Sequence, residues 1–232
     1  MTAQPWISVV LPAFNESGAL EHVVRGVDRA IATAGHNGEI IIVNDGSTDQ
    51  TPMIADRLQR TLRTVRVIHH DQNIGYGAAQ RTGIQAASGS FVCVLPADGQ
   101  VPPDELLKYF AAAERADVIV GAYRNRPDGI LRRLFSWTYR LVLRALFDLR
   151  LRNVNAPKLF RREQLVGIEV SAHRGFADAQ IMIQLRRQGR QFHEIEVTCL
   201  PRATGRSSIG MATVLESIRE LWAFYRRANT GP

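Results

Sequence analysis

The chain has 232 residues, 45% of them hydrophobic and 22% charged, which is the composition of an ordinary globular protein with a sizeable core. Its net charge is +7, and residues 124–162 alone carry +9. Because the positive charge is local, it argues against non-specific nucleic-acid binding over the whole surface and for one face that meets an anionic partner. No run approaches the roughly 18 apolar residues of a membrane-spanning helix, and residues 1–11 do not resemble a signal peptide, so we expect a cytoplasmic protein.

Strand-like and helical segments alternate through the first half of the chain. Apolar, β-rich runs predict strands at residues 6–11, 39–43, 65–69, 91–95 and 117–122. Helices are expected between them, the first over residues 19–34 with Asn15 or Ser17 as its N-cap. Strands that alternate with helices of roughly ten to fifteen residues predict an α/β fold with a mostly parallel, doubly wound sheet.

Polar residues or glycines follow the predicted strands. Glu16 follows the first strand, Asp45 the second, and Asp98 with Gln100 the fourth, while a glycine-rich loop at residues 73–77 follows the third. The carboxyl ends of parallel strands meet at one edge of a sheet, which is where open α/β sheets bind ligands. Each loop alone could be an ordinary turn, because Asn, Asp, Gly and Ser are common in turns. Their repetition favours a shared site.

The sequence contains neither a GxxxxGK[ST] segment nor a GxGxxG first turn, which argues against a P-loop and against a dinucleotide oxidoreductase. It does contain an ordered motif series: LPAFNE at 11–16, VNDGSTD at 43–49, NxGxGxA at 73–79, Gly89, ADGQ at 97–100, Arg124, Arg133, NAPKLFRR at 155–162 and RxxGxS at 202–207. This series resembles that of the inverting family 2 glycosyltransferases, which have the GT-A (nucleotide-diphospho-sugar transferase) fold. Within that family the chain is similar to the polyprenyl-phosphate (dolichol-phosphate) mannosyl- and glucosyltransferases.

The resemblance implies a role for each matching residue. The residues implied to hold the nucleotide-diphospho-sugar are Pro12, Ala13, Phe14, Glu16, Asp45, Gly75, Asp98 and Gln100. Asp98 is also implied in catalysis, as the ligand of a Mg²⁺ or Mn²⁺ ion that bridges the donor diphosphate. Asp45 would accept a nucleobase N–H. The residues implied to meet phosphate oxygens of donor or acceptor are Arg124, Arg133, Lys158, Arg202 and Ser207.

Three positions depart from the family pattern, and each departure removes a negative charge. Pro96 stands where the usual Asp-x-Asp metal motif has its first aspartate, Asn44 where Asp-Asp is frequent, and Asn153 where an aspartate is expected. These changes leave metal use open. They also keep open a non-catalytic protein that binds nucleotide sugars.

The acceptor decides whether the reaction needs a general base. A lipid phosphate is already anionic near pH 7 and can attack without one, so positioning and leaving-group stabilisation would supply most of the rate. A saccharide or other hydroxyl acceptor needs a base, and Asp178 is the candidate for that catalytic role. The alternative is that Asp178 caps the helix expected over residues 179–188.

Residues 129–148 are predicted to form a basic amphipathic helix. One stripe of this helix is apolar and contains Leu131, Leu134, Phe135, Tyr139, Val142 and Leu146. The other contains Arg133, Trp137, Arg140 and Arg144. Arginine interleaved with tryptophan is typical of a helix in the membrane interface, and a core-packed helix with a basic solvent face is the alternative.

A second amphipathic stretch at residues 211–227 could do similar work, or it could pack on the domain or on a second subunit. We therefore expect one domain, with a nucleotide-sugar-binding half at residues 1–122 and an acceptor-binding half at residues 123–232. The expected setting is peripheral, at the inner face of the membrane. A membrane-protein partner or a homo-oligomer stays open, and no nucleic-acid partner is expected.

Overall fold

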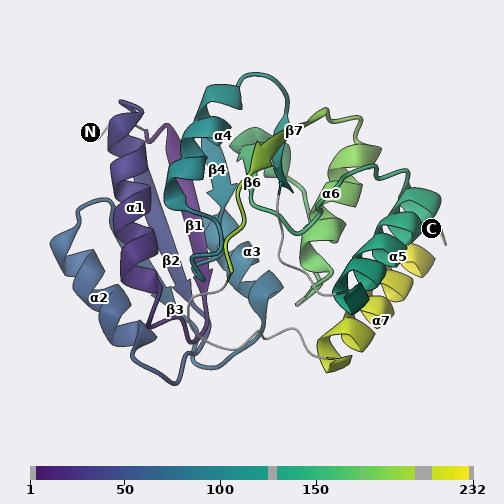
Figure 1. Ribbon diagram of the computed structural model, residues 1–232, viewed down its shortest axis with the longest axis horizontal. Helices are drawn as coiled ribbons and strands as arrows, with labels where there is room; N and C mark the ends of the chain where they lie inside the picture. The colour runs from purple at the N-terminus through teal and green to yellow at the C-terminus, as the bar shows by residue number, and fades with distance from the viewer. Residues whose placement is uncertain (1–3, 125–129, 174, 202–210, 230–232) are drawn as a thin grey trace.

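The computed structural model describes residues 4–124, 130–173, 175–201 and 211–229 (Figure 1). The strands of these residues form one sheet in the order β3-β2-β1-β4-β6-β5-β7. They are β1 (Ile7–Ala13), β2 (Gly38–Asn44), β3 (Val65–His69), β4 (Phe91–Val94), β5 (Val118–Tyr123), β6 (Lys158–Arg161) and β7 (Phe192–Val197). Only the pairings of β6 with β4 and β5 are antiparallel, so the predicted mostly parallel α/β sheet is confirmed.

Helices cover both faces of the sheet. They are α1 (Leu20–Thr33), α2 (Thr51–Thr61), α3 (Tyr76–Ala86), α4 (Leu106–Ala112), α5 (Ile130–Phe147), α6 (Ala177–Arg187) and α7 (Met211–Asn229), with short 3₁₀ turns η1 (Pro103–Glu105) and η2 (Arg162–Leu165). Figure 1 shows α1 and α2 at one end of the molecule and α5 and α7 at the other. No helix in the described ranges is both long enough and apolar enough to cross a bilayer.

The sequence of β1 explains the two helical layers. Successive side chains of a strand point to opposite faces, and every residue of β1 is buried. Val9 and Leu11 join the core beneath α1, α2 and α4, whereas Val10 joins the core beneath α3, α5, α6 and α7. A strand buried on both faces reads as a continuous apolar run, which is why the sequence predicted it.

The five predicted strands correspond to β1–β5, but β6 was not predicted. It is only four residues long and follows Pro157, and it runs antiparallel between β4 and β5. Its partners are distant in sequence, so no local pattern marks it. All seven strands of the described residues share one sheet, so both predicted halves of the chain contribute to it.

The predicted N-cap of the first helix was wrong. The N-cap of α1 is Ala19, and no side chain caps it. Asn15 instead adopts a left-handed conformation with φ of 56°, and its Oδ1 accepts a hydrogen bond of 2.8 Å from the backbone N–H of Thr48. The polar side chain therefore joins two strand-end loops rather than starting the helix.

Candidate functional site

The loops that follow β1, β2, β3 and β4 lie together at one edge of the sheet, which we call the carboxyl edge. Ala13, the last residue of β1, is in register with Asn44, and Asn44 is in register with His69. The N–H of Asp45 donates to the carbonyl of Ala13 at 2.9 Å, and the N–H of Ala97 donates to that of Pro12 at 3.4 Å. Asp45 and Asp98 therefore follow directly on either side of the end of β1.

The loop after β1 is fixed to the loop after β2. Pro12 and Ala13 are buried in β1, and Glu16 is buried behind the loop, where its N–H donates to Thr51 Oγ1 at 2.9 Å. Phe14 is 36% exposed and is the large apolar side chain that this loop presents to solvent. The loop can thus offer an aromatic face on a rigid base.

The side chain of Asp45 forms hydrogen bonds with the loop after β3. Its Oδ1 accepts hydrogen bonds from His70 Nδ1 at 2.8 Å and from the N–H of Ile74 at 3.1 Å. Its Oδ2 accepts the N–H of Gly75 at 2.8 Å. The side chain is almost fully buried, so in this structure it shapes residues 70–75, and its predicted contact with a nucleobase stays a prediction.

Asp98 lies in the loop after β4, at the carboxyl edge, and is partly exposed. Its Oδ1 accepts the N–H of Gln100 at 3.1 Å. The side chain and backbone of Gln100 both bond to Leu200, with Nε2 donating to its carbonyl at 3.3 Å and the carbonyl of Gln100 accepting its N–H at 2.7 Å. The loop after β4 is therefore joined to the segment that leads to residue 202.

The chemistry of Asp98 fits a hard divalent cation. Mg²⁺ in nucleotide sites is typically held by one or two carboxylates, with phosphate oxygens and water completing the shell. Among the described residues no three His, Cys, Asp or Glu side chains converge on one point. Asp98 would thus be the protein ligand, and a diphosphate would supply further oxygens.

Tyr76 lies at the start of α3, directly after Gly75, and the sequence analysis did not single it out. Burial raises the pKa of its hydroxyl well above the usual value, and the negative charges of Asp178 and Asp98 raise it further. The hydroxyl therefore stays protonated at neutral pH and can act as a hydrogen-bond donor. The one available signal was its place in the glycine-rich loop, directly after Gly75.

The backbone on both sides of Tyr76 is fixed. Gly75 is held by Asp45, and the N–H of Gly77 donates to the carbonyl of His173 at 2.8 Å. A Cβ on Gly77 would lie 2.4 Å from the carbonyl oxygen of Ala172, so only glycine fits against this segment. The start of α3 is thus clamped between the loop after β2 and the segment before α6.

Asp178 forms a buried ion pair. Its Oδ1 accepts hydrogen bonds from Lys158 Nζ at 2.7 Å and from Gln80 Nε2 at 3.0 Å. Lys158 is 2% exposed and also donates to the carbonyl of Ala156 at 2.7 Å. The alternative of an N-cap was wrong, because Phe176 is the N-cap of α6 and Asp178 lies inside its first turn. The carboxylate links α6, α3 and β6.

The predicted phosphate-binding residues are spread over several elements. Arg124 is exposed just after β5, and its N–H donates to the carbonyl of Val197 at 3.0 Å. Since β5 is parallel to β4, Arg124 lies at the carboxyl edge. Arg133 is exposed in the first turns of α5. Arg202 and Ser207 lie outside the described residues, and their placement stays a prediction.

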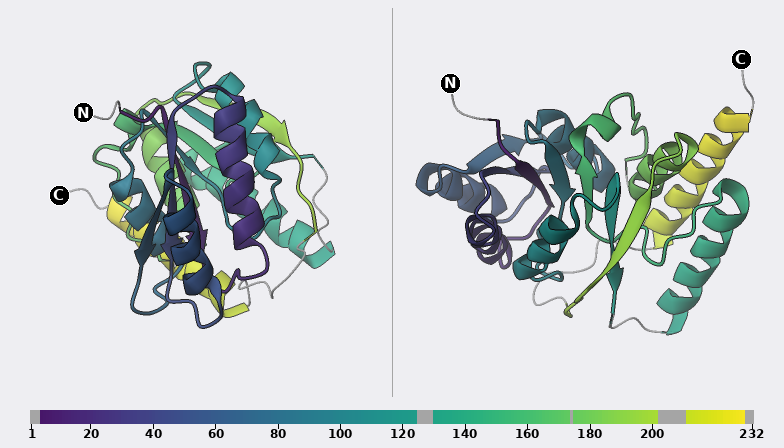
Figure 2. Two further views of the ribbon diagram at one scale, coloured as in Figure 1. Left: turned by 90° about the vertical axis from the view of Figure 1, so that its left-hand side faces the viewer. Right: turned by 90° about the horizontal axis from the view of Figure 1, so that it is seen from above.

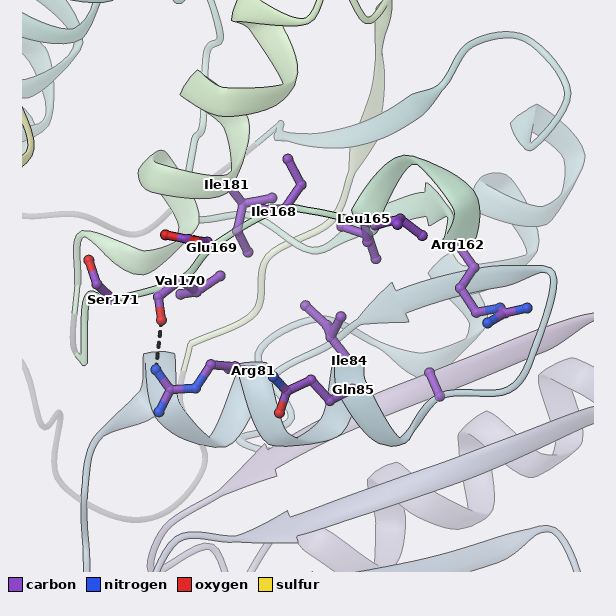
Figure 3. A pocket seen from close by; sticks show the side chains of 12 residues that line it. Arg81, Ile84, Gln85, Arg162, Leu165, Ile168, Glu169, Val170, Ser171 and Ile181 are labelled. Carbon is purple, nitrogen blue, oxygen red and sulfur yellow. Dashed lines mark hydrogen bonds between the residues drawn. The ribbon is translucent and has the colours of Figure 1, made fainter. Parts of the chain in front are cut away.

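Two hollows lie near these elements. One of about 340 Å³ is lined by residues 69–72 and Ile74, beside the loop that Asp45 holds. Another, of about 510 Å³, lies between α3, η2 and the segment before α6, where Arg81 donates to the carbonyl of Val170 at 2.6 Å (Figure 3). The second hollow contains no residue of the carboxyl-edge loops, so it is a separate feature.

The sequence model of glycosyl transferase family 2 matches residues 8–176. The chain belongs to glycosyltransferase family 2. This glycosyltransferase is 28% identical over 237 residues to the dodecaprenyl-phosphate galacturonate synthase of Rhizobium johnstonii, covering 97% of this chain and 69% of that protein. It is 33% identical over 132 residues to the undecaprenyl-phosphate 4-deoxy-4-formamido-L-arabinose transferase of Klebsiella pneumoniae, covering 56% of this chain but only 40% of that protein.

Solved structures show the same GT-A fold. Glucosyl-3-phosphoglycerate synthase from Mycobacterium tuberculosis, in complex with Mn²⁺, UDP-glucose and phosphoglyceric acid, superposes with a TM-score of 0.73 at 20% identity, covering 98% of this family 2 chain and 82% of that one. The complex of that enzyme with Mn²⁺, UDP and glucosyl-3-phosphoglycerate gives 0.69 at 22% identity, with coverage of 96% and 77%. The predicted GT-A fold is confirmed.

Proposed function

We propose that this glycosyltransferase moves a hexose from a nucleotide-diphospho-sugar to polyprenyl phosphate, with inversion at the anomeric carbon. The observation that carries the proposal is the carboxyl edge, where Asp45 and Asp98 flank the end of β1. The two sequence relatives from Rhizobium johnstonii and Klebsiella pneumoniae are named for dodecaprenyl and undecaprenyl phosphate, which supports a polyprenyl phosphate as the acceptor.

In this proposal, the loops after β1 to β3 bind the nucleoside. Phe14 offers a ring to the base, and Pro12, Ala13 and Glu16 give that loop its shape. Asp45 acts mainly by holding Gly75 and the rest of its loop against the ligand, and it would contact the base only at the rim of its buried carboxylate.

Asp98 holds the diphosphate end of the donor. When bound, Mg²⁺ or Mn²⁺ would neutralise negative charge on the leaving diphosphate. Gln100 keeps the loop of Asp98 in place, and Arg124, together with Arg202 and Ser207, would contact phosphate oxygens. These groups stabilise charge that develops as the bond between the anomeric carbon and the diphosphate oxygen breaks.

An oxygen of the acceptor phosphate forms the new bond to the anomeric carbon, on the side opposite to the departing nucleoside diphosphate. The nucleophile is already an anion near pH 7, so no proton has to be removed from it. The O–H of Tyr76 can donate a hydrogen bond to the sugar or to either phosphate. Arg133 is exposed and can contact the acceptor phosphate directly. Lys158 is buried and paired with Asp178, so it would act on the acceptor only through that carboxylate.

We place the reaction at the cytoplasmic face of the membrane, with the protein bound peripherally, because the acceptor is a lipid whose headgroup lies at that surface.

A transfer assay tests the proposal. A panel of nucleotide sugars is incubated with short polyprenyl phosphates and Mg²⁺ or Mn²⁺, and the products are identified by mass spectrometry. We expect one donor to give a glycosyl polyprenyl phosphate with inverted configuration. Binding of donors without any turnover would contradict the proposal and select a non-catalytic protein.

The competing function is transfer to a hydroxyl group, and the placement of Asp178 at the start of α6 is the observation in its favour. Asp178→Asn separates the two. It should abolish transfer to an alcohol, which needs a base, but should only weaken transfer to a phosphate. The ion pair with Lys158 favours transfer to a phosphate over transfer to an alcohol. Asp178 Oδ1 already accepts two hydrogen bonds, which argues against a role as a general base.

A further inference from the structure

His70 pairs with Asp45 at the carboxyl end of β3, and no step of the proposed reaction accounts for it. Its N–H extends the sheet beyond β3 by donating to the carbonyl of Asn44 at 2.9 Å. Its side chain is 12% exposed, and that of Asp45 is 3% exposed. The pair is therefore largely shielded from water, where a hydrogen bond holds its partners more firmly than at an exposed site.

The partners of His70 assign a hydrogen to one ring nitrogen. Nδ1 lies 2.8 Å from Asp45 Oδ1, and an ionised carboxylate can only accept, so Nδ1 carries a hydrogen. Nε2 lies 3.0 Å from the hydroxyl of Thr82, which can donate or accept. The adjacent ring of His69 instead directs its Nε2 at Asp56, at 3.1 Å. The two histidines are thus not equivalent, and only the ring of His70 is directed at Asp45.

These contacts form a closed circuit around the start of α3. Asp45 accepts the N–H of Gly75 at 2.8 Å, α3 begins at the next residue, and Thr82 lies on the same helix. Thr82 then returns to Asp45 through the ring of His70. A carboxylate held from both sides cannot turn without breaking a hydrogen bond in a buried place, which is unfavourable. His70 therefore sets the angle of the Asp45 carboxylate.

The hydrogen bonds use most of the acceptor capacity of this carboxylate. An ionised carboxylate has about four lone-pair sites. Within the described residues, Oδ1 accepts from His70 and Ile74, at 2.8 and 3.1 Å, and Oδ2 accepts from Gly75 at 2.8 Å. One site on Oδ2 is left. Asp45 can therefore accept one further N–H, but not two.

We propose that His70 is a specificity-determining residue for the nucleobase, which acts by positioning Asp45 with one acceptor site free. Uracil and thymine offer a single ring N–H between two carbonyl groups, so one acceptor satisfies them. Guanine offers a ring N–H and an amino group side by side, and its second donor would lose a hydrogen bond to water without replacement. Cytosine and adenine present a ring nitrogen lone pair there, which a carboxylate repels. The role rests on the proposed function, because it needs a nucleotide donor at the carboxyl edge.

Isothermal titration calorimetry with UDP, dTDP and GDP, each with Mn²⁺, tests the proposal without turnover. We expect UDP and dTDP to bind at least about tenfold more tightly than GDP. His70→Phe keeps a ring but removes the donor to Asp45, so the Kd of UDP should rise about tenfold and the preference over GDP should shrink. Binding of inorganic pyrophosphate with Mn²⁺ should stay unchanged, because pyrophosphate has no base.

Three further variants separate positioning from packing. His70→Asn places an amide nitrogen the same number of bonds from Cβ as Nδ1, so it should recover most of the affinity that His70→Phe loses. Thr82→Val removes the hydroxyl at Nε2 but keeps the branched shape, and it should weaken UDP binding by a smaller factor. His193→Phe is the matched control, since His193 is partly exposed in β7, at the opposite edge of the sheet from β3 (Figure 2). It should bind all three nucleotides as the unaltered protein does.

Two measurements show whether His70 acts through Asp45. In a double-mutant cycle, His70→Phe should add little to the loss of UDP binding in Asp45→Asn, because the two residues share one hydrogen bond. Nitrogen-15 NMR of the histidine rings should show a hydrogen on Nδ1 of His70 before any nucleotide is added. Circular dichroism checks that each variant is folded. If His70→Phe does not fold, Thr82→Val and the NMR spectrum decide.

Four results would overturn the proposal: GDP bound as tightly as UDP and dTDP, unchanged UDP binding in His70→Phe, an equal loss of pyrophosphate binding in that variant, or a hydrogen on Nε2 of His70 alone. Failure of the proposed function gives a different result. Nucleotides that bind without any transfer of sugar would contradict the proposed function and leave the role of His70 intact. A protein that binds none of the three nucleotides would contradict both.

Discussion

The carboxyl edge and the outer side of α5 differ in how their side chains are held. At the carboxyl edge, Asp45 accepts three hydrogen bonds and Gln100 makes two with Leu200, so the loops are cross-linked before any ligand arrives. On the outer side of α5, Trp137 and Arg140 are exposed and the arginine has no ion-pair partner within the described ranges. A fixed geometry suits one small ligand that must be positioned for chemistry. Exposed apolar and basic side chains suit a broad surface such as the membrane interface, which has no fixed geometry to match.

The largest effect is expected at the buried ion pair of Lys158 and Asp178. Lys158→Met leaves Asp178 buried without its charge partner, which should cost about 3–5 kcal/mol in the free energy of unfolding. Urea unfolding measures it. Lys108, the other lysine of the chain, is half exposed, and Lys108→Met should change stability by less than about 0.5 kcal/mol. Equal effects of the two substitutions would show that the buried pair is not a structural link.

The next largest effect concerns the carboxyl edge alone. Asp98→Asn keeps the shape of the side chain but removes the charge that a metal ion needs, so transfer should fall at least about 100-fold. The melting temperature without ligand should stay the same, because Asp98 is partly exposed and, among the described residues, its carboxylate accepts a hydrogen bond from its own loop only. Asp104→Asn, at an exposed position in η1, is the matched control and should keep full activity. Normal transfer by Asp98→Asn would remove Asp98 from the site.

Tyr76 should give a smaller effect. Tyr76→Phe removes one hydroxyl, and with it a hydrogen-bond donor that we propose contacts the sugar or a phosphate, so kcat/KM should fall about tenfold. Binding of nucleoside diphosphate alone should change little. Tyr225→Phe on α7 removes a hydroxyl at a distance from the carboxyl edge, and steady-state kinetics should show no change. A Tyr76→Phe enzyme as active as the unaltered one would exclude a contact with the reacting groups.

The smallest effect is expected at the opposite, amino edge of the sheet. Burial alone would raise the pKa of Glu39, but hydrogen bonds from Ser88 and Ser8 outweigh it and lower the pKa below its usual value of 4.5. Because its pKa is lower in the folded state than in the unfolded state, the carboxylate stabilises the fold at pH values above the unfolded-state pKa. This stabilisation is lost as the pH falls through the folded-state pKa. Glu39→Gln should therefore cost about 1 kcal/mol at pH 7, and the cost should shrink as the pH falls through the folded pKa.

Unfolding curves at pH 7 and at lower pH measure the effect of Glu39→Gln, and transfer at pH 7 should be normal. A loss of activity without a loss of stability would mean that the two edges are not independent.

The sequence allowed most of the first five strands and their loops to be predicted, because buried parallel strands are apolar runs and their polar ends follow directly. The partners of Asp178 could not be predicted, since Lys158 and Gln80 lie 20 and 98 positions away. The engagement of Asp45 with Gly75 likewise depends on a loop about 30 residues further along the chain. Helical periodicity predicted the apolar stripe of α5. It could not predict which part of that stripe is buried against the core, because this depends on how α5 and α7 pack.

Binding of a nucleoside diphosphate at the carboxyl edge is the claim on which the rest depends. Thermal denaturation of the protein with UDP, GDP or dTDP, each with and without Mn²⁺, measures it directly. We predict that one nucleotide raises the melting temperature, that Mn²⁺ increases the rise, and that Asp98→Asn abolishes the increase due to the metal. No shift with any of the three nucleotides, or an equal metal-dependent shift in Asp98→Asn, would contradict the account.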